Sequence, residues 1–287
     1  MENTTTFTIY TKKFIIQIIP TFIFFTIYVI LFNHPFIESI NHIYKRGYWF
    51  TIALFEYFLF YSLAVFLSRT NKIITEKYSY ILILCLVLFI FLLTIKGIIP
   101  YNISNPLGLV QLKFFPYFIF GILVHKYFNF FSYTMDKKIP ISIIVCIFFI
   151  SVYINNFEKE MNLIIQIIYP YIPGFTGICI VFLFFRKYQE QFSTMTKIGK
   201  VLQYIGKKTL DIYLLHYFFL PINLSNIGLL FIQNENPTLE LFTTMFLALI
   251  VIIMCLIFSY IIRLSPLLEQ YLFGVRSNKR LLNNDFK

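Results

Sequence analysis

The feature that most constrains this protein is a series of eight apolar stretches separated by polar segments. They lie near residues 13–33, 47–67, 78–95, 112–131, 139–154, 161–185, 209–233 and 239–262. Most have the roughly 18–20 residues that an α-helix needs to cross about 30 Å of hydrocarbon. Only 13% of the residues are charged, against about a quarter in ordinary soluble domains. The pattern predicts an all-α, polytopic membrane bundle of about eight transmembrane helices.

The basic residues predict its orientation. With the N-terminus in the cytoplasm, nineteen of the 24 lysines and arginines fall on the cytoplasmic side. The opposite side keeps Lys45, Arg46, Lys96, Lys113 and Lys159. Cytoplasmic loops retain Lys and Arg in this way. We therefore expect an even number of spans and two cytoplasmic termini.

The net charge of +11 does not indicate a nucleic-acid partner, because the charge borders apolar spans and no nucleic-acid motif is present. We expect it to contact anionic membrane lipid. The four cysteines lie inside apolar stretches without metal-ligand spacing, so no metal site is expected. Abundant Lys, Ile, Phe, Asn and Tyr are typical of an AT-rich genome, and a bacterial origin would place the protein in the inner membrane.

Ionisable residues inside apolar stretches are candidates for function, because a charge at mid-bilayer costs roughly 2.5–3.5 kcal/mol. Glu56 lies near the middle of the second stretch. It either takes or positions a proton, or is a neutral acid bonded to a neighbouring helix. His216, on the seventh stretch, is either a general base or a neutral imidazole bonded to a Tyr or a backbone carbonyl.

Asp211 lies five residues before His216, about 140° away around a helix, so the two cannot form a dyad on one face. Its place just after Lys207 and Lys208 favours helix-start electrostatics. Trp49 is the only tryptophan; an interface anchor competes with a substrate-stacking role. Arg46, with His34, His42 and Lys45, belongs to the first outer loop, where a grip on an anionic substrate competes with simple solvation.

Three segments resemble acyltransferase family 3 membrane proteins. Residues 206–216 (GKKTLDIYLLH) resemble the family signature G-K-x-S/T-L-x-I-Y-L-L-H near the C-terminus. Residues 115–123 (FPYFIFGIL) are similar to a mid-sequence F-P-Y-F-x-x-G helix, and residues 48–55 to a W-F-x-x-A-L helix. The order and spacing agree over about residues 10–265.

The resemblance implies a ten-helix inner-membrane enzyme that moves an acyl group from a cytoplasmic donor, commonly acetyl-CoA, to a sugar of a cell-surface glycan. The family's proposed general-base His lies in a first helix that, with the second, we expect this protein to lack, so no residue is assigned to that role by resemblance. Residues 12–20 (KKFIIQIIP) resemble a family segment R-x-x-R-x-x-P, with Gln17 in place of the second Arg.

The sequence thus predicts an N-terminal cytoplasmic segment (1–12), a transmembrane acyltransferase-3-like domain (13–265) and a polar cytoplasmic tail (266–287). The predicted catalytic residues are His216 and Glu56. Lys12 and Lys13 are predicted to bind the acyl-CoA donor, and Trp49 and Arg46 the glycan acceptor, with no bound cofactor. Two alternatives remain open: a transporter of polysaccharide or lipid-linked sugar, and an inactive, truncated family member.

Overall fold

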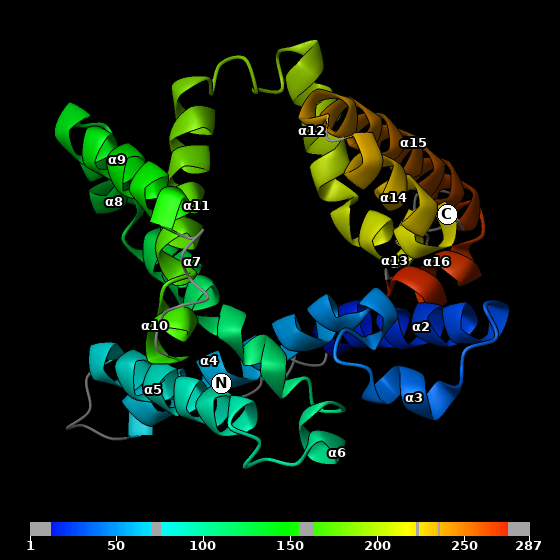
Figure 1. Cartoon of the computed structure of the whole chain (residues 1–287), viewed down its shortest axis with the longest axis horizontal. Coiled ribbons are helices and arrows are strands. Elements are labelled where there is room, and N and C mark those ends of the chain that lie inside the picture. Colours follow the sequence, from blue (N-terminus) through cyan, green and yellow to red (C-terminus); the bar gives the residue numbers. More distant parts are fainter. Residues whose placement is uncertain (1–12, 71–75, 155–162, 222–223, 235, 275–287) are drawn as a thin grey trace, which may run out of the picture. The chain divides into compact units, whose positions relative to one another are not determined.

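The computed structural model describes residues 13–70, 76–154, 163–221, 224–234 and 236–274. These residues form helices joined by turns, and no strand occurs among them (Figure 1). The all-α, polytopic helical class is therefore confirmed.

Six helices in the described ranges are long and apolar enough to cross a membrane, or seven if one bent pair counts as a span. The six are Phe14–Leu31, Trp49–Arg69, Tyr78–Ile95, Leu109–Lys126, Ile165–Lys187 and Pro237–Arg263. The bent pair is Phe128–Met135 with Lys138–Ile154, at 83°. Each of these corresponds to an expected span. The number eight and the cytoplasmic placement of the termini stay predictions.

The expected span 209–233 is built differently from the others. It contains two short helices, α13 (Thr209–Phe219) and α14 (Leu224–Asn234). Leu220 ends α13 with an extended backbone, φ −65° and ψ 139°. Pro221 is the cause, because a proline disfavours the helical conformation in the residue before it.

The protein divides into two compact units: residues 1–115 with 207–287, and residues 116–206. In the first, α4 (Trp49–Thr70) packs against α5 (Glu76–Ile95), and α13 packs against both α15 (Pro237–Arg263) and α2 (Ile19–Leu31). Its core includes Phe24, Val29, Tyr48, Leu214 and Cys255. Short helices complete it: η1 (Phe14–Ile18), α3 (Phe36–Asn41), η2 (Lys45–Gly47), α6 (Tyr101–Ser104), η3 (Leu109–Phe114) and α16 (Pro266–Phe273).

Helix α16 lies in the segment 266–287 that the sequence predicts to be a polar tail. It packs against α2 and α15, and Phe273 is 1% exposed. The Phe273 ring lies 5.9 Å from Phe24, between centroids, and the Arg263 guanidinium stands 4.6 Å above it. Residues 266–273 are therefore part of the helical core of this unit.

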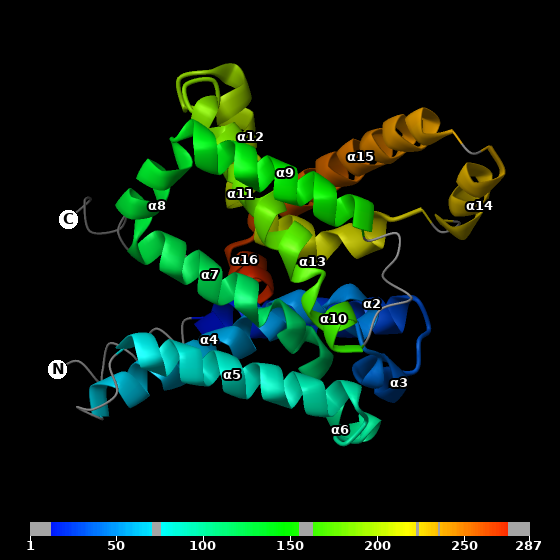
Figure 2. The same ribbon diagram turned by 60° about the vertical axis from the view of Figure 1, so that its left-hand side comes forward.

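The second unit is held together by aromatic rings. It contains α8 (Phe128–Met135), α9 (Lys138–Ile154), α10 (Leu163–Ile168), α11 (Tyr171–Lys187), most of α7 (Phe115–Lys126) and most of α12 (Lys197–Lys207). Helices α9 and α11 run side by side (Figure 2). Phe175 of α11 packs against Tyr117 and Phe120 of α7, with ring centroids 4.7 and 5.1 Å away. Both α7 rings belong to the F-P-Y-F-x-x-G segment, which therefore packs α7 on α11.

Candidate active site

A strained turn precedes α4 and begins the site. Lys45, Arg46 and Gly47 have positive φ angles of 43°, 51° and 105°. Such angles are costly for residues with a Cβ. At Gly47 a Cβ would also overlap the Tyr217 ring, so this position needs glycine. The turn directs Lys45 into the protein.

Lys45 is a buried cation, not a solvated loop residue. The residue is 5% exposed, and its Nζ donates to the carbonyl oxygens of Ile40 at 3.1 Å and Asn105 at 2.7 Å. An ammonium has three N–H donors, so one stays available. Burial lowers the pKa of Lys45, and the charge of Glu56 opposes this by raising it.

Glu56 lies in α4, seven residues or about 10 Å beyond Trp49 along the helix. Its two carboxylate oxygens lie 3.7 and 3.8 Å from the point where a Cβ on Gly108 would stand. Gly108 has a φ of 66°, so the backbone reaches the carboxylate at a position where any residue with a Cβ is disfavoured. Oε2 of Glu56 is buried, and no described residue hydrogen-bonds to it.

Other unsatisfied polar atoms occur in the segments that meet around Lys45. In the described ranges, seven buried side-chain atoms have no hydrogen-bond partner: Gln17 Oε1, Ser39 Oγ, Arg46 Nε, Glu56 Oε2, Ser104 Oγ, Asn105 Oδ1 and Gln111 Oε1. Buried polar atoms in folded proteins are nearly always paired with protein or water. All but Gln17 belong to residues 39–56 or 104–111, so these segments form a polar centre fit for a hydrated or polar ligand.

A cavity of about 170 Å³ adjoins this centre. Lys45 is the one charged residue in its lining, which also includes Thr21, Ile40, Tyr48, Ile52 and Pro106. Thr21 and Thr51 share a buried hydrogen bond of 2.7 Å between α2 and α4. The cavity therefore joins a buried cation to a mostly apolar space of small volume.

His216 lies on α13 and lines a separate groove of about 480 Å³ with residues of α13 and α15. Its Nδ1 lies 2.8 Å from the carbonyl oxygen of Tyr213 and 3.2 Å from that of Ile212. Because carbonyl oxygens only accept, Nδ1 carries the proton in the neutral ring and Nε2 has the free lone pair. The carbonyl bond fits the structural alternative, while the free Nε2 keeps the base alternative open. No hydrogen bond or ion pair joins Glu56 and His216, both of which the structure describes.

Helix α13 instead supports the site through the Tyr213 hydroxyl and the Leu214 carbonyl. The Tyr213 hydroxyl donates to the Gly47 carbonyl and accepts from the Phe50 amide, each at 3.0 Å. The Tyr48 hydroxyl donates to the Leu214 carbonyl, also at 3.0 Å. The 206–216 signature thus fixes the strained turn that carries Lys45.

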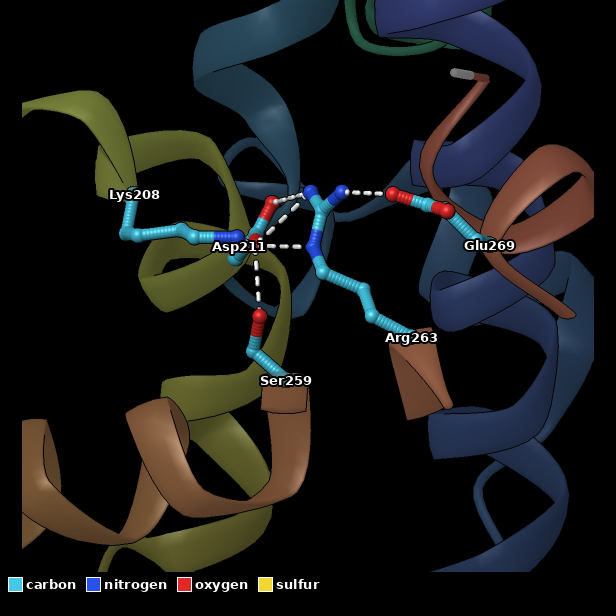
Figure 3. A network of polar contacts seen from close by, with 5 residues as sticks. All are labelled: Lys208, Asp211, Ser259, Arg263 and Glu269. Carbon is cyan, nitrogen blue, oxygen red and sulfur yellow. Dashed lines mark hydrogen bonds and ion pairs between the residues drawn. The ribbon is translucent and has the colours of Figure 1, made fainter. Parts of the chain in front are cut away.

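Asp211 is the centre of a buried ionic network (Figure 3). Arg263 of α15 donates to both Asp211 oxygens at 2.9 Å, and the Ser259 hydroxyl donates at 2.5 Å. Arg263 also bonds Glu269 of α16 at 2.6 Å. The expected Lys208–Asp211 ion pair is present at 3.4 Å, but the network as a whole ties α13, α15 and α16 together.

The remaining predicted site residues lie outside this centre or at its border. Lys12 is outside the described residues. The Lys13 ammonium stands 2.8 Å from the centroid of the Phe58 ring, two residues beyond Glu56 and therefore on another face of α4. Trp49 stacks on Phe114 at 5.5 Å between ring centroids, and Arg46 adjoins Lys45 in the turn. The donor and acceptor roles of all four stay predictions.

Sequence reasoning named Lys45 only as an outer-loop residue that either binds an anionic substrate or is solvated, and it missed Gln111 and the close approach of Gly108. One signal was present for Lys45: a Lys-Arg-Gly triplet directly before an apolar span, on the side where basic residues are scarce. Gln111 carried no comparable signal. Its Nε2 donates to the Ile43 carbonyl at 3.3 Å and its backbone carbonyl accepts from the Tyr57 hydroxyl at 2.5 Å, contacts that only the folded state reveals.

Fold and site together define a multi-pass helical membrane protein with a buried polar centre. Comparison with known families then gives the particular assignment. Residues 1–264 match the family model described as an acyltransferase domain, so this protein belongs to acyltransferase family 3. No curated protein and no solved structure matches it.

Proposed function

We propose that this membrane acyltransferase moves an acetyl or other acyl group from a cytoplasmic acyl-CoA to a hydroxyl of a cell-surface polysaccharide or lipid-linked glycan. The proposed location is a bacterial inner membrane, where a cytoplasmic donor and an external glycan face opposite sides of one protein. Family membership supports acyl transfer in general. The polar centre supports the more specific chemistry.

The observation that carries the proposal is that two side chains of opposite charge type, Glu56 and Lys45, interact electrostatically in this centre and each keep hydrogen-bonding capacity. Glu56 has a buried carboxylate oxygen without a partner, and Lys45 has one N–H beyond the two carbonyls that it bonds. A buried polar or charged group without a complete set of hydrogen bonds is costly. A substrate that donates to Glu56 and accepts from Lys45 would remove that cost.

Acyl transfer to a hydroxyl uses both the unpaired oxygen of Glu56 and the remaining N–H of Lys45. The acceptor hydroxyl gives its proton to Glu56 while its oxygen attacks the thioester carbonyl. A C–O bond forms, and a negative oxygen develops that the Lys45 ammonium stabilises. The C–S bond then breaks, and the CoA thiolate takes up the proton. The 170 Å³ cavity beside Lys45 suits a short acyl group.

His216 is the second candidate for the base. Its Nε2 lone pair belongs to a ring that lines the groove between α13 and α15. In this version a hydroxyl in the groove gives its proton to Nε2, and the charge of Glu56 acts only on Lys45. Trp49 and Arg46 would contact the glycan, and Lys12 and Lys13 the phosphates of the donor.

Purified protein in proteoliposomes, supplied with radiolabelled acetyl-CoA and a glycan acceptor, tests the proposal. We expect label in the glycan. Glu56→Gln should lower the rate at least about 100-fold if Glu56 is the base, because general-base catalysis contributes about 10²–10⁴-fold. Glu240→Gln is the matched control, since Glu240 is exposed at the start of α15.

His216→Gln separates the two bases, with the exposed His125→Gln as its control. A large loss in Glu56→Gln alone assigns the base to Glu56, and a loss in His216→Gln alone assigns it to His216. Full rates in both variants would refute the site. Movement of glycan across the vesicle without label transfer would show a transporter instead.

A further inference from the structure

Helix α12, in the connection after α11, has two chemically distinct faces. Ile198, Val201, Leu202 and Ile205 follow the i, i+3, i+4, i+7 spacing that puts them on one side of a helix. Lys200 and Lys207 lie on the opposite arc, and Lys197 lies at the edge of the apolar arc, about 40° from Val201. At 100° per residue, the apolar arc is about 100° wide, and Lys200 and Lys207 centre about 160° from its middle.

The apolar face of α12 is largely exposed among the described residues. Ile198 is 64% exposed, Val201 58% and Leu202 43%. The proposed acyltransferase chemistry makes no use of this helix, and its residues line none of the cavities described above. An apolar stripe of this kind indicates a contact surface.

Local contacts hold α12 beside the end of a membrane span. Phe192, in the connection, packs against Phe184 and Phe185 in the last turns of α11, with ring centroids 5.8 and 4.9 Å away. Gln203 of α12 donates from Nε2 to the Phe192 carbonyl at 3.1 Å. The Thr196 hydroxyl caps the helix by accepting from the Gly199 amide at 3.0 Å. The candidate span ends at Lys187, so these contacts attach α12 to the end of that span.

We propose that α12 is an interfacial helix that binds anionic lipid. Its apolar arc enters the boundary between headgroups and acyl tails, as amphipathic surface helices do. The lysines reach the lipid phosphates from the polar side, their alkyl stems lying along the apolar surface. The lysines of α12 favour negatively charged headgroups. The exposed apolar arc and the attachment of α12 to the end of a span favour a lipid surface as its binding partner.

Spin labels at two neighbouring positions test this in proteoliposomes containing phosphatidylglycerol. In a background in which Cys85, Cys146, Cys179 and Cys255 are replaced, Ile198→Cys puts a label on the apolar arc. Lys200→Cys puts one about 200° away on the polar arc. Both positions are exposed, so neither label should disturb folding. The label at 198 should collide mainly with dissolved oxygen, and the label at 200 mainly with a water-soluble nickel chelate.

Lipid charge supplies the second arm. Each lysine near an anionic surface changes membrane association by about fivefold. Replacing phosphatidylglycerol by phosphatidylcholine, or changing Lys197 and Lys207 to Gln, should therefore weaken the oxygen preference at 198. A label at 198 that meets nickel as freely as the one at 200 would refute the proposal. A label shielded from both reagents would assign the face to a protein partner, such as a second copy, and would also overturn it.

Discussion

At the scale of single residues, the turn from Lys45 to Gly47 links the fold to the proposed chemistry. Gly47 combines a φ of 105° with contact against Tyr217. We predict that Gly47→Ala lowers the free energy of unfolding by about 2 kcal/mol, since a strained backbone residue costs roughly 1–3 kcal/mol. It should also lower activity by displacing Lys45. Gly121→Ala is the control, because a Cβ there meets no atom within 4 Å.

Thermal inactivation in detergent, followed by size-exclusion chromatography, measures both glycine variants. Gly121→Ala should match or slightly exceed the parent, because alanine is the better helix former. Equal midpoints for the two variants would show that the turn is not strained in the folded protein.

Two bidentate Asp–Arg pairs give a second prediction at this scale. The Asp211 side chain is 5% exposed in its pair with Arg263, whereas that of Asp136 is 52% exposed in its pair with Arg186. We predict that Asp211→Asn costs about 1.5–3 kcal/mol of unfolding free energy, the range for a hydrogen bond to a charged group, with Glu269 still pairing Arg263. Asp136→Asn should change stability little, because solvent screens exposed pairs. Equal losses in a thermal shift assay would contradict the network.

Sequence reasoning reached part of this chemistry. Glu56 and His216 are identifiable because few ionisable residues occur inside apolar stretches. Lys45 is not, because a lysine before a span is usually solvated, and only its contacts with Ile40 and Asn105 show burial. The sequence places Asp211 next to Lys207 and Lys208, and the structure pairs it with Lys208. Arg263 lies 52 residues further along the sequence, and no local pattern joins it to Asp211.

At the scale of secondary-structure elements, α16 shows that the segment after Arg263 belongs to the core. Phe273 fills the space between α2 and Arg263. We predict that Phe273→Ala lowers the free energy of unfolding by about 3 kcal/mol, near the usual cost of emptying a buried aromatic position. Tyr271→Ala, at a position 64% exposed, should stay within about 0.5 kcal/mol of the parent. The same thermal assay compares the two variants. Equal unfolding midpoints would show that α16 does not contribute to the core.

Hydropathy predicted where helices occur better than where they break. The span 47–67 became α4 and 239–262 became α15, because long apolar runs leave the backbone no alternative to a helix in lipid. The span 209–233 divides at Pro221, whose effect on Leu220 is local and invisible to a hydropathy average. The tail prediction missed α16 because eight residues give too little periodicity to stand out.

At the scale of the whole molecule, the sorting of basic residues predicts the two sides. In a background without native cysteines, Leu107→Cys should react with an impermeant maleimide applied outside intact cells. Gln189→Cys should react only after the membrane is opened. Both positions are exposed, so access depends on sidedness alone. If both cysteines react from the same side, the predicted topology is wrong. The proposed path from a cytoplasmic donor to an external acceptor would then be wrong as well.

Transfer across a sealed membrane tests the central claim most directly. Labelled acetyl-CoA is enclosed with the Gln189 side of reconstituted protein, and glycan is supplied only on the Leu107 side. We predict labelled glycan outside and free CoA inside, with the rate at least about 100-fold lower in Glu56→Gln and unchanged in Glu240→Gln. Two results would contradict an acyltransferase that works through the polar centre of Glu56 and Lys45. One is equal transfer by the parent protein and both variants, and the other is recovery of all the label as unreacted acetyl-CoA.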